Sequence, residues 1–415
     1  MTSRLGADVP PALVDEILSS ITPLLGDSAD INIVPSALQT VAVIVTQKNA
    51  LAAKIRKEVV PQIYAVAVSS AAQGPALQAL TDFFMQFVKA DPSSGAPILD
   101  DLFAQAHALK KTGSNHSTQS LNVLAKCIGA VVRQVQGSVR QNALERAKAG
   151  FAAKDEQTIF LSLRLSGEIG RVVDLSGDGD LLKSIIACYD SSVEEVRDAA
   201  AYALGGLAVG NLAAFIPVIE QHITSNESKR YLSLHALKEV IAHSHASNLA
   251  PVAERIWQPL FDISDSKDEA SRSISAECLG RLTMADPERY LVQLQSYLRS
   301  DSASARAAVL VAVRYTLTEH AGNLDELLAP LIVDFLALLK DSEVEVRRHA
   351  VLVFNSAAYN KPHLIREWLE TLLPLLYKQT VPDPTLLRKV PMGPFTITQD
   401  DGLELRKVSG RLIRA

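Results

Sequence analysis

Apolar and polar positions follow the 3.6-residue spacing of amphipathic helices along most of the chain, and one such pattern recurs. In Asp190 to Asn211 an acidic turn leads through a hydrophobic residue and Arg197 into a helix rich in alanine and leucine. Asp341 to Ala358 repeats that order, with Arg347 in the place of Arg197. Weaker copies lie between them, so the chain contains an internal repeat.

An arginine marks the start of the second helix in each repeat. These anchor arginines are Arg197, Arg230, Arg272, Arg306, Arg347 and Arg406, and the first five are separated by 33, 42, 34 and 41 residues. A period of this size is typical of stacked helix pairs. We therefore predict an all-α fold, a HEAT-type α-solenoid in which each antiparallel helix pair buries its apolar face on its neighbours.

The anchor arginines are predicted to belong to the framework of the repeats. A cation in the first turn of a helix is poorly placed for the helix dipole. We therefore expect an aspartate of a neighbouring repeat to hold each arginine, so that the pairs form a ladder. The aspartate that recurs before the second helix is expected to cap the N-terminus of that helix.

The period breaks near the C-terminus, because Arg406 follows Arg347 by 59 residues. We divide the chain into a repeat array of about nine helix pairs (1–380), an insertion (381–400) and the start of the next helix (401–415). Four prolines exclude a helix from the insertion, whereas Phe395 to Thr398 are strand formers. The insertion is thus predicted to form a β-hairpin or extended finger, with an irregular surface loop as the alternative.

Composition agrees with packed helices and narrows the function. Hydrophobic residues make up 48% of the chain but aromatic residues only 5%, so small aliphatic side chains must fill the core. A net charge of −5 argues against a general nucleic-acid binder. No apolar run approaches the about 20 residues that span a bilayer, and the N-terminus does not resemble a secretory signal. We expect no membrane partner and a cytoplasmic and nuclear location.

Residues with chemical potential do not form a catalytic or metal-binding pattern. Cys127, Cys188 and Cys278 are far apart within helical patterns, so we expect buried free thiols. The acidic loop 174–180 lacks the bidentate acid at the twelfth position of a calcium loop, where Ile185 stands. We therefore predict no enzyme activity, no cofactor and no metal site.

The segment around the insertion resembles a known family. The run VPMGPFTITQDDGLELRK at 390–407 is similar to the MGPF and DDGL segment of the cullin-associated and neddylation-dissociated protein family. Further ordered matches lie at 161–177, 199–217, 229–241, 276–288 and 355–367.

The resemblance implies a HEAT-repeat factor that wraps a cullin and its RING subunit. In that family a β-hairpin occupies the surface where the substrate-receptor adaptor docks on the cullin N-terminal domain. The resemblance maps that hairpin onto Val390, Met392, Gly393, Pro394, Phe395, Asp400 and Asp401, whereas Thr396, Ile397, Thr398 and Gln399 depart from the family pattern. We choose Phe395 as the anchoring side chain, since aromatic residues dominate interface energetics.

Two functions remain open from the sequence. The first is a non-catalytic regulator of cullin-RING ubiquitin ligases that competes with the adaptor and so promotes receptor exchange. Because family members continue with further repeats, we expect this chain to be one part of a shortened or divided factor, with a separate N-terminal arm as companion. The second is a generic HEAT-repeat scaffold or nuclear transport receptor that binds cargo on its concave face.

Overall fold

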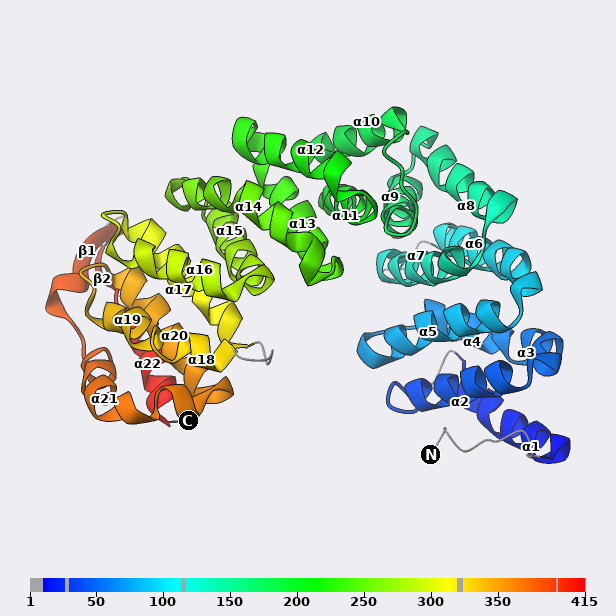
Figure 1. Ribbon diagram of the computed structural model, residues 1–415, viewed down its shortest axis with the longest axis horizontal. Helices are drawn as coiled ribbons and strands as arrows, with labels where there is room; N and C mark the ends of the chain where they lie inside the picture. The colour runs from blue at the N-terminus through cyan, green and yellow to red at the C-terminus, as the bar shows by residue number, and fades with distance from the viewer. Residues whose placement is uncertain (1–9, 27–29, 113–116, 319–323, 393–394, 415) are drawn as a thin grey trace. The chain divides into compact units, whose positions relative to one another are not determined.

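The structure, a computed structural model, describes residues 10–26, 30–112, 117–318, 324–392 and 395–414 (Figure 1). Within these ranges it consists of helices joined by short loops and of one strand pair near the C-terminus. The chain divides into two compact units, Met1–Phe215 and Ile216–Ala415. The helix α12 (Leu212–Ser225) contains the point of division.

The first unit is a stack of helix pairs. Its helices are α1 (Pro11–Ile21), α2 (Val34–Gln47), α3 (Ala52–Glu58), α4 (Val60–Val68), α5 (Gly74–Ala90), α6 (Gly95–Thr112), α7 (Ser117–Gln134), α8 (Gly137–Ala149), α9 (Glu156–Gly170), α10 (Gly179–Ala187) and α11 (Glu194–Gly210).

The second unit continues in the same way and then carries the strands. Its elements after α12 are α13 (Glu227–His243), α14 (Ala246–Asp262), α15 (Glu269–Leu282), α16 (Pro287–Ser296), α17 (Ala303–Leu317), α18 (Leu324–Leu328), α19 (Ile332–Ala337), α20 (Val344–Asn360), α21 (Leu369–Lys378), β1 (Leu387–Met392), β2 (Phe395–Asp400) and α22 (Leu403–Arg414).

The second helices of successive pairs pack on one another in chain order. In the first unit the order is α2, α5, α7, α9 and α11, and in the second it is α13, α15, α17, α20 and α22. The first helix of each pair covers the other side of its partner (Figure 1). This arrangement confirms the predicted all-α HEAT-type fold with one inserted hairpin.

Small residues allow the closest of these helix contacts. The α9 and α11 backbones approach so tightly that a Cβ atom at Gly206 would lie 2.3 Å from the carbonyl oxygen of Gly167. The neighbouring α11 residues Ala199, Ala200 and Ala203 are fully or almost fully buried. The alanine and glycine residues of the repeat are therefore explained by close packing of the two helix backbones, and no ligand site is needed to explain them.

The cysteines follow the sequence prediction in two of three cases. Cys127 and Cys278 are buried free thiols, and burial raises the pKa of each to about 12. Cys188 is also a free thiol but is only half-buried, so the expectation of a buried position was wrong for this residue. It lies in the 3₁₀ turn that ends the first helix of its pair, where packing is incomplete.

The acids of the loop 174–180 have structural partners. The carboxylate of Asp174 accepts hydrogen bonds from the Ser176 N–H and from the Asn211 side chain, each at 2.9 Å. Asp178 caps α10 and forms an ion pair with Lys148. In the described ranges no group of three or more His, Cys, Asp or Glu side chains is arranged to hold a metal ion.

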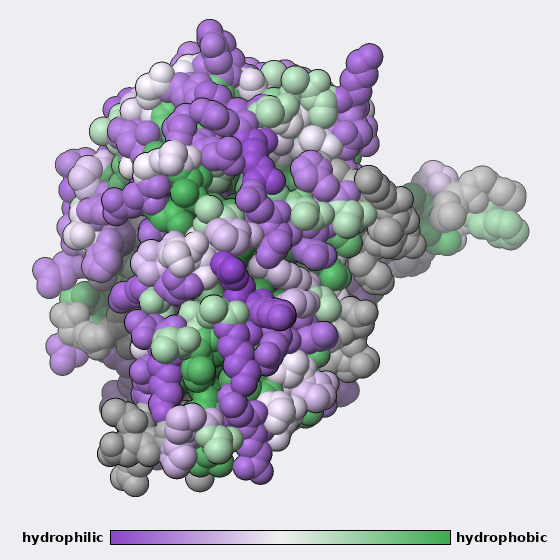
Figure 2. Space-filling view, turned by 90° about the vertical axis from the view of Figure 1, so that its right-hand side faces the viewer, coloured by the Kyte–Doolittle hydropathy of each residue, from purple (hydrophilic) through white to green (hydrophobic). Residues whose placement is uncertain are grey.

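The surface is mainly polar on the face drawn in Figure 2, where hydrophobic residues show as small separate areas between hydrophilic ones. Among the helices that the structure describes, none combines the length and the apolar character needed to cross a membrane.

Candidate functional site

The insertion between α21 and α22 forms a two-stranded antiparallel hairpin. Val390 pairs with Ile397 across the strands, and Met392 pairs with Phe395. The sequence prediction of a hairpin rather than an irregular loop is therefore confirmed. Both strands are edge strands, which is why β1 tolerates a proline that donates no ladder hydrogen bond.

One face of the hairpin is apolar and open to solvent. Directly paired residues lie on the same face of a sheet, so Val390, Phe395 and Ile397 share one face. The side chain of Phe395 is 73% exposed and that of Ile397 is 45% exposed, whereas Val390 is half-buried. Phe395 and Ile397 together form an exposed apolar patch on a structured element, which is typical of a binding surface.

The other predicted hairpin residues lie elsewhere on the element. Thr396 and Thr398 are exposed on the opposite face, with Lys389 paired to Thr398. Gly393 and Pro394 belong to the predicted site but lie outside the described residues.

Asp400 and Asp401 are placed at the base of the hairpin and fix it to the repeat. The N–H of Asp401 donates to the Leu386 carbonyl at 3.1 Å and closes the base, and its carboxylate pairs with Arg388 Nε at 2.9 Å. The carboxylate of Asp400 pairs with Arg406, the last anchor arginine. These contacts hold the strands in place while the apolar face remains uncovered.

The anchor arginines act inside their own repeats. Four of them donate a hydrogen bond from Nη1 to the backbone carbonyl of the residue six positions earlier. That residue stands at the end of the first helix of the same pair. These bonds are Arg197 to Ser191 (2.9 Å), Arg272 to Ser266 (2.7 Å), Arg306 to Ser300 (2.7 Å) and Arg347 to Asp341 (2.8 Å). Arg230 makes a similar bond through Nε to Ile223 at 2.9 Å. These arginines thus satisfy carbonyls that the end of a helix leaves without partners.

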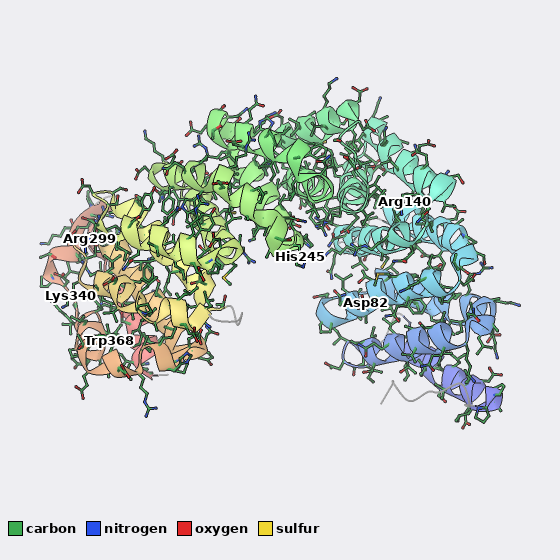
Figure 3. All side chains as sticks on the ribbon, in the orientation of Figure 1. Asp82, Arg140, His245, Arg299, Lys340 and Trp368 are labelled. Atoms are coloured by element: carbon green, nitrogen blue, oxygen red, sulfur yellow. The ribbon has the colours of Figure 1, made fainter. Side chains whose placement is uncertain are left out.

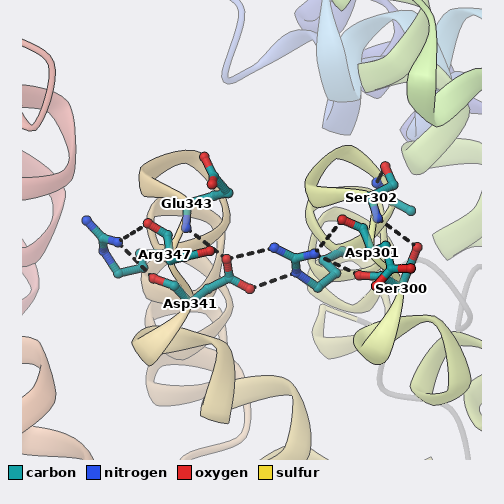
Figure 4. Close-up of polar contacts among 9 residues, drawn as sticks. Ser300, Asp301, Ser302, Asp341, Glu343 and Arg347 are labelled. Atoms are coloured by element: carbon teal, nitrogen blue, oxygen red, sulfur yellow. Dashed lines mark hydrogen bonds and ion pairs between the residues drawn. The ribbon is translucent and has the colours of Figure 1, made fainter.

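The predicted ladder between repeats is present at one position in the described chain. Arg306 donates two hydrogen bonds to the Asp341 carboxylate, from Nε to Oδ2 at 2.7 Å and from Nη2 to Oδ1 at 2.9 Å (Figure 4). The prediction of such a pair at every anchor was wrong. Arg406 pairs with an aspartate of its own repeat, Asp400, and the remaining anchors have local carbonyl acceptors: Arg197, Arg230, Arg272 and Arg347. Residues six positions before the anchors are mostly serine or threonine, which offer no negative charge.

The predicted aspartate N-cap is likewise not general. Asp268 caps α15, but Ser302 caps α17 and Asn226 caps α13. The starts of α11 and α20 have no side-chain cap. Asp341 instead accepts the Glu343 N–H at 2.9 Å, which leaves its carboxylate oriented toward Arg306 (Figure 4).

Acid is expected to remove the stabilising effect of the Arg306–Asp341 pair. The two side chains are 12% and 6% exposed. Burial opposes ionisation of Asp341, but the hydrogen bonds from Arg306 and Glu343 outweigh it and lower its pKa below 3.8. A depressed folded-state pKa stabilises the fold above 3.8, and this contribution is lost as the pH falls through the folded value.

The substitution Asp341→Asn should therefore lower the free energy of unfolding by about 2 kcal/mol at neutral pH. The difference from the unsubstituted chain should shrink as the pH falls below 3.8. Urea titrations across that range measure it, with Asp180→Asn as control because the Asp180 side chain is 93% exposed. A constant difference at every pH would contradict the assignment.

Sequence reasoning did not find which face of the hairpin is apolar, nor a groove beside its base. Alternation in Phe395 to Thr398 signals two faces, but the pairing register decides which β1 residues join each face. The groove unites residues as far apart in the chain as Leu339 and Arg406, for which a single sequence holds no signal.

Fold and site together define a HEAT-type repeat protein with an exposed hairpin between the two helices of one repeat. The family model described as TATA-binding protein interacting (TIP20) matches residues 364–410, which include the hairpin. Cullin-associated NEDD8-dissociated protein 1 of Drosophila melanogaster is 34% identical over 417 residues, which cover 96% of this chain and 33% of that protein.

A relative from Emericella nidulans is described as the C-terminal part of cullin-associated NEDD8-dissociated protein 1. It is 34% identical over 344 residues, which cover 82% of this chain and 32% of the relative. The chain belongs to the family of the cullin-associated NEDD8-dissociated proteins, and it spans about a third of the length of the curated relatives it matches.

Among solved structures, karyopherin Kap121p bound to Pho4p aligns over 98% of this chain and 46% of its own. The TM-score is 0.45 and the sequence identity is 13%.

Proposed function

We propose that this chain binds a cullin without catalysing a reaction on it, and that its hairpin competes with the substrate-receptor adaptor for one surface of the cullin N-terminal domain. The observation that carries the proposal is the position of Phe395, 73% exposed on the apolar face of a hairpin whose base is fixed by hydrogen bonds. The names of its relatives support a cullin as the partner.

The mechanism is mutual displacement. If hairpin and adaptor occupy overlapping surfaces of one cullin, binding of either raises the dissociation rate of the other, and receptors exchange. A rigid hairpin suits this role, since a preorganised contact loses little conformational entropy on binding.

Binding by this chain alone is expected to be weak. A companion N-terminal arm that contacts the cullin together with its RING subunit would make the second contact intramolecular and raise the overall affinity. We place this assembly in the cytoplasm and nucleus. A nuclear transport receptor, the alternative from the sequence, would have no evident use for the hairpin.

Co-purification tests the proposal. A tagged cullin–RING complex should retain this chain weakly by itself and strongly when the companion N-terminal chain is present. Excess adaptor should release it in both cases. Retention of the chain by a nuclear-import GTPase, with none by the cullin, would instead select the transport alternative.

A further inference from the structure

In the part of the chain that the structure describes, Arg347 has no carboxylate partner in a neighbouring repeat, and it lines a groove. Arg306 donates a hydrogen bond from Nη1 to the Ser300 carbonyl, at the end of the first helix of its own repeat. Its Nε and Nη2 donate to the Asp341 carboxylate of the next repeat. Arg347 makes the same local bonds through Nη1, to the carbonyls of Asp341 and Ser342. Within the described residues, no hydrogen-bond acceptor lies at its Nε or Nη2.

The inserted hairpin explains the difference. Asp341 lies six residues before Arg347, and Asp400 lies six residues before Arg406, so Asp400 is the sequence equivalent that would reach back to Arg347. The structure turns Asp400 onto Arg406 and the Gly402 N–H instead. In Figure 4 the Arg347 side chain points away from α17, toward the C-terminal segments drawn in orange and red.

The groove in front of Arg347 combines an apolar floor with a basic rim. It has a volume of about 640 Å³, and its floor is formed by Leu339, Leu375, Leu386 and Leu405. Lys340 and Lys378 line the groove and are exposed to solvent. Figure 3 shows Lys340 on the same side of the second unit as the two strands.

The acids that line the groove balance only part of this charge. Asp341 is held by Arg306, and Asp383 accepts hydrogen bonds from the N–H and hydroxyl of Thr385 at 2.9 and 2.6 Å. Among the described residues that line the groove, Asp383 is thus the one carboxylate that faces Arg347 and Lys378, and after the Thr385 hydrogen bonds both cations help to lower its pKa. With Lys340 as a third cation, the groove keeps an excess of positive charge.

We propose that this groove is a second contact site for the partner protein, in which the Nε and Nη2 fork of Arg347 binds an aspartate or glutamate side chain of that partner. An adjacent apolar side chain of the same segment fills the floor, and Lys340 and Lys378 attract the acidic segment. The proposal rests on the proposed function, and it adds the chemistry that the groove recognises. Guanidinium and carboxylate groups match in a bidentate geometry that the Arg306 pair already displays in this chain.

The test titrates the full chain against a purified cullin–RING complex at two salt concentrations. Arg347→Gln should lower the affinity about tenfold, since it removes two charge-assisted hydrogen bonds. The double variant Lys340→Glu with Lys378→Glu should lower it to a similar extent and weaken the salt dependence. Both lysines are exposed, so this variant is expected to keep the fold.

Arg197→Gln is the matched control, because it removes the same helix-end bond in the first unit. It should lower stability as Arg347→Gln does and leave cullin affinity unchanged. Wild-type affinity in both groove variants, with weaker binding by Phe395→Ala, would overturn the groove proposal and leave the proposed function standing. No cullin binding by the unsubstituted chain would overturn both.

Sodium phosphate distinguishes a free anion from a partner side chain. If phosphate raised the melting temperature of the isolated chain only when Arg347 was present, and the groove variants bound the cullin normally, the groove would be a phosphate site and the proposal would be wrong. Competition between phosphate and the cullin for the unsubstituted chain, absent in Arg347→Gln, would support it.

Discussion

Replacement of Phe395 by alanine is expected to weaken the displacement of adaptor from a cullin by at least about tenfold. A central aromatic anchor contributes roughly 2 kcal/mol or more to an interface when it becomes buried. The free protein should hardly change, because the side chain is 73% exposed and supports no core. A competition titration, in which the chain is added to a preformed cullin–adaptor complex, measures the effect.

A matched control and a larger change complete this experiment. Tyr359→Ala removes another aromatic side chain, 83% exposed at the end of α20, and should leave displacement unchanged. Exchange of Val390 to Gln399 for a flexible linker should abolish displacement. Full displacement by the linker variant would refute the competition mechanism.

Gly206→Ala is expected to lower the free energy of unfolding by about 3 kcal/mol or more, a large loss for the addition of one methyl group. Its Cβ would lie 2.3 Å from the carbonyl oxygen and 2.6 Å from the Cα of Gly167, so α9 and α11 would have to move apart. Backbone atoms cannot change rotamer to make room, unlike the end of a flexible side chain.

For the helical glycine Gly410, substitution by alanine is expected to raise the free energy of unfolding instead of lowering it. A Cβ there meets no atom within 4 Å, so Gly410→Ala should raise stability by up to about 1 kcal/mol through helix propensity. Thermal unfolding and amide hydrogen exchange of α9 and α11 measure both effects. A loss of stability in Gly410→Ala as large as in Gly206→Ala would show that the close contact is not the cause.

The sequence predicted the repeat but not the role of its recurring arginine. The spacing of Arg197, Arg272 and Arg347 correctly marks second helices, because helix periodicity is a local property of the chain. The acceptor of each guanidinium depends on the direction of the carbonyl of the residue that follows the preceding 3₁₀ turn. That orientation follows from the folded loop, so a charge-based ladder was the simpler and mostly incorrect prediction.

For the candidate site, too, the sequence predicted the local element but not the contacts between distant residues. Proline density and the late position of Arg406 were enough to predict a hairpin, and its strands run from Leu387 to Asp400. The groove that both Arg347 and Leu405 line arises from folding back of the insertion and has no counterpart in local sequence.

The closure of the hairpin base has a consequence for how this protein can change over evolutionary time. One hydrogen bond of 3.1 Å, from the Asp401 N–H to the Leu386 carbonyl, brings the two ends of the insertion together. Apart from Arg388 and Asp400, whose ion pairs fix the base, the residues between them form a structural unit whose length and sequence we expect to tolerate change. New binding specificities can therefore arise by exchange of this unit alone. A hairpin from a relative could be transplanted into this chain between Leu386 and Asp401.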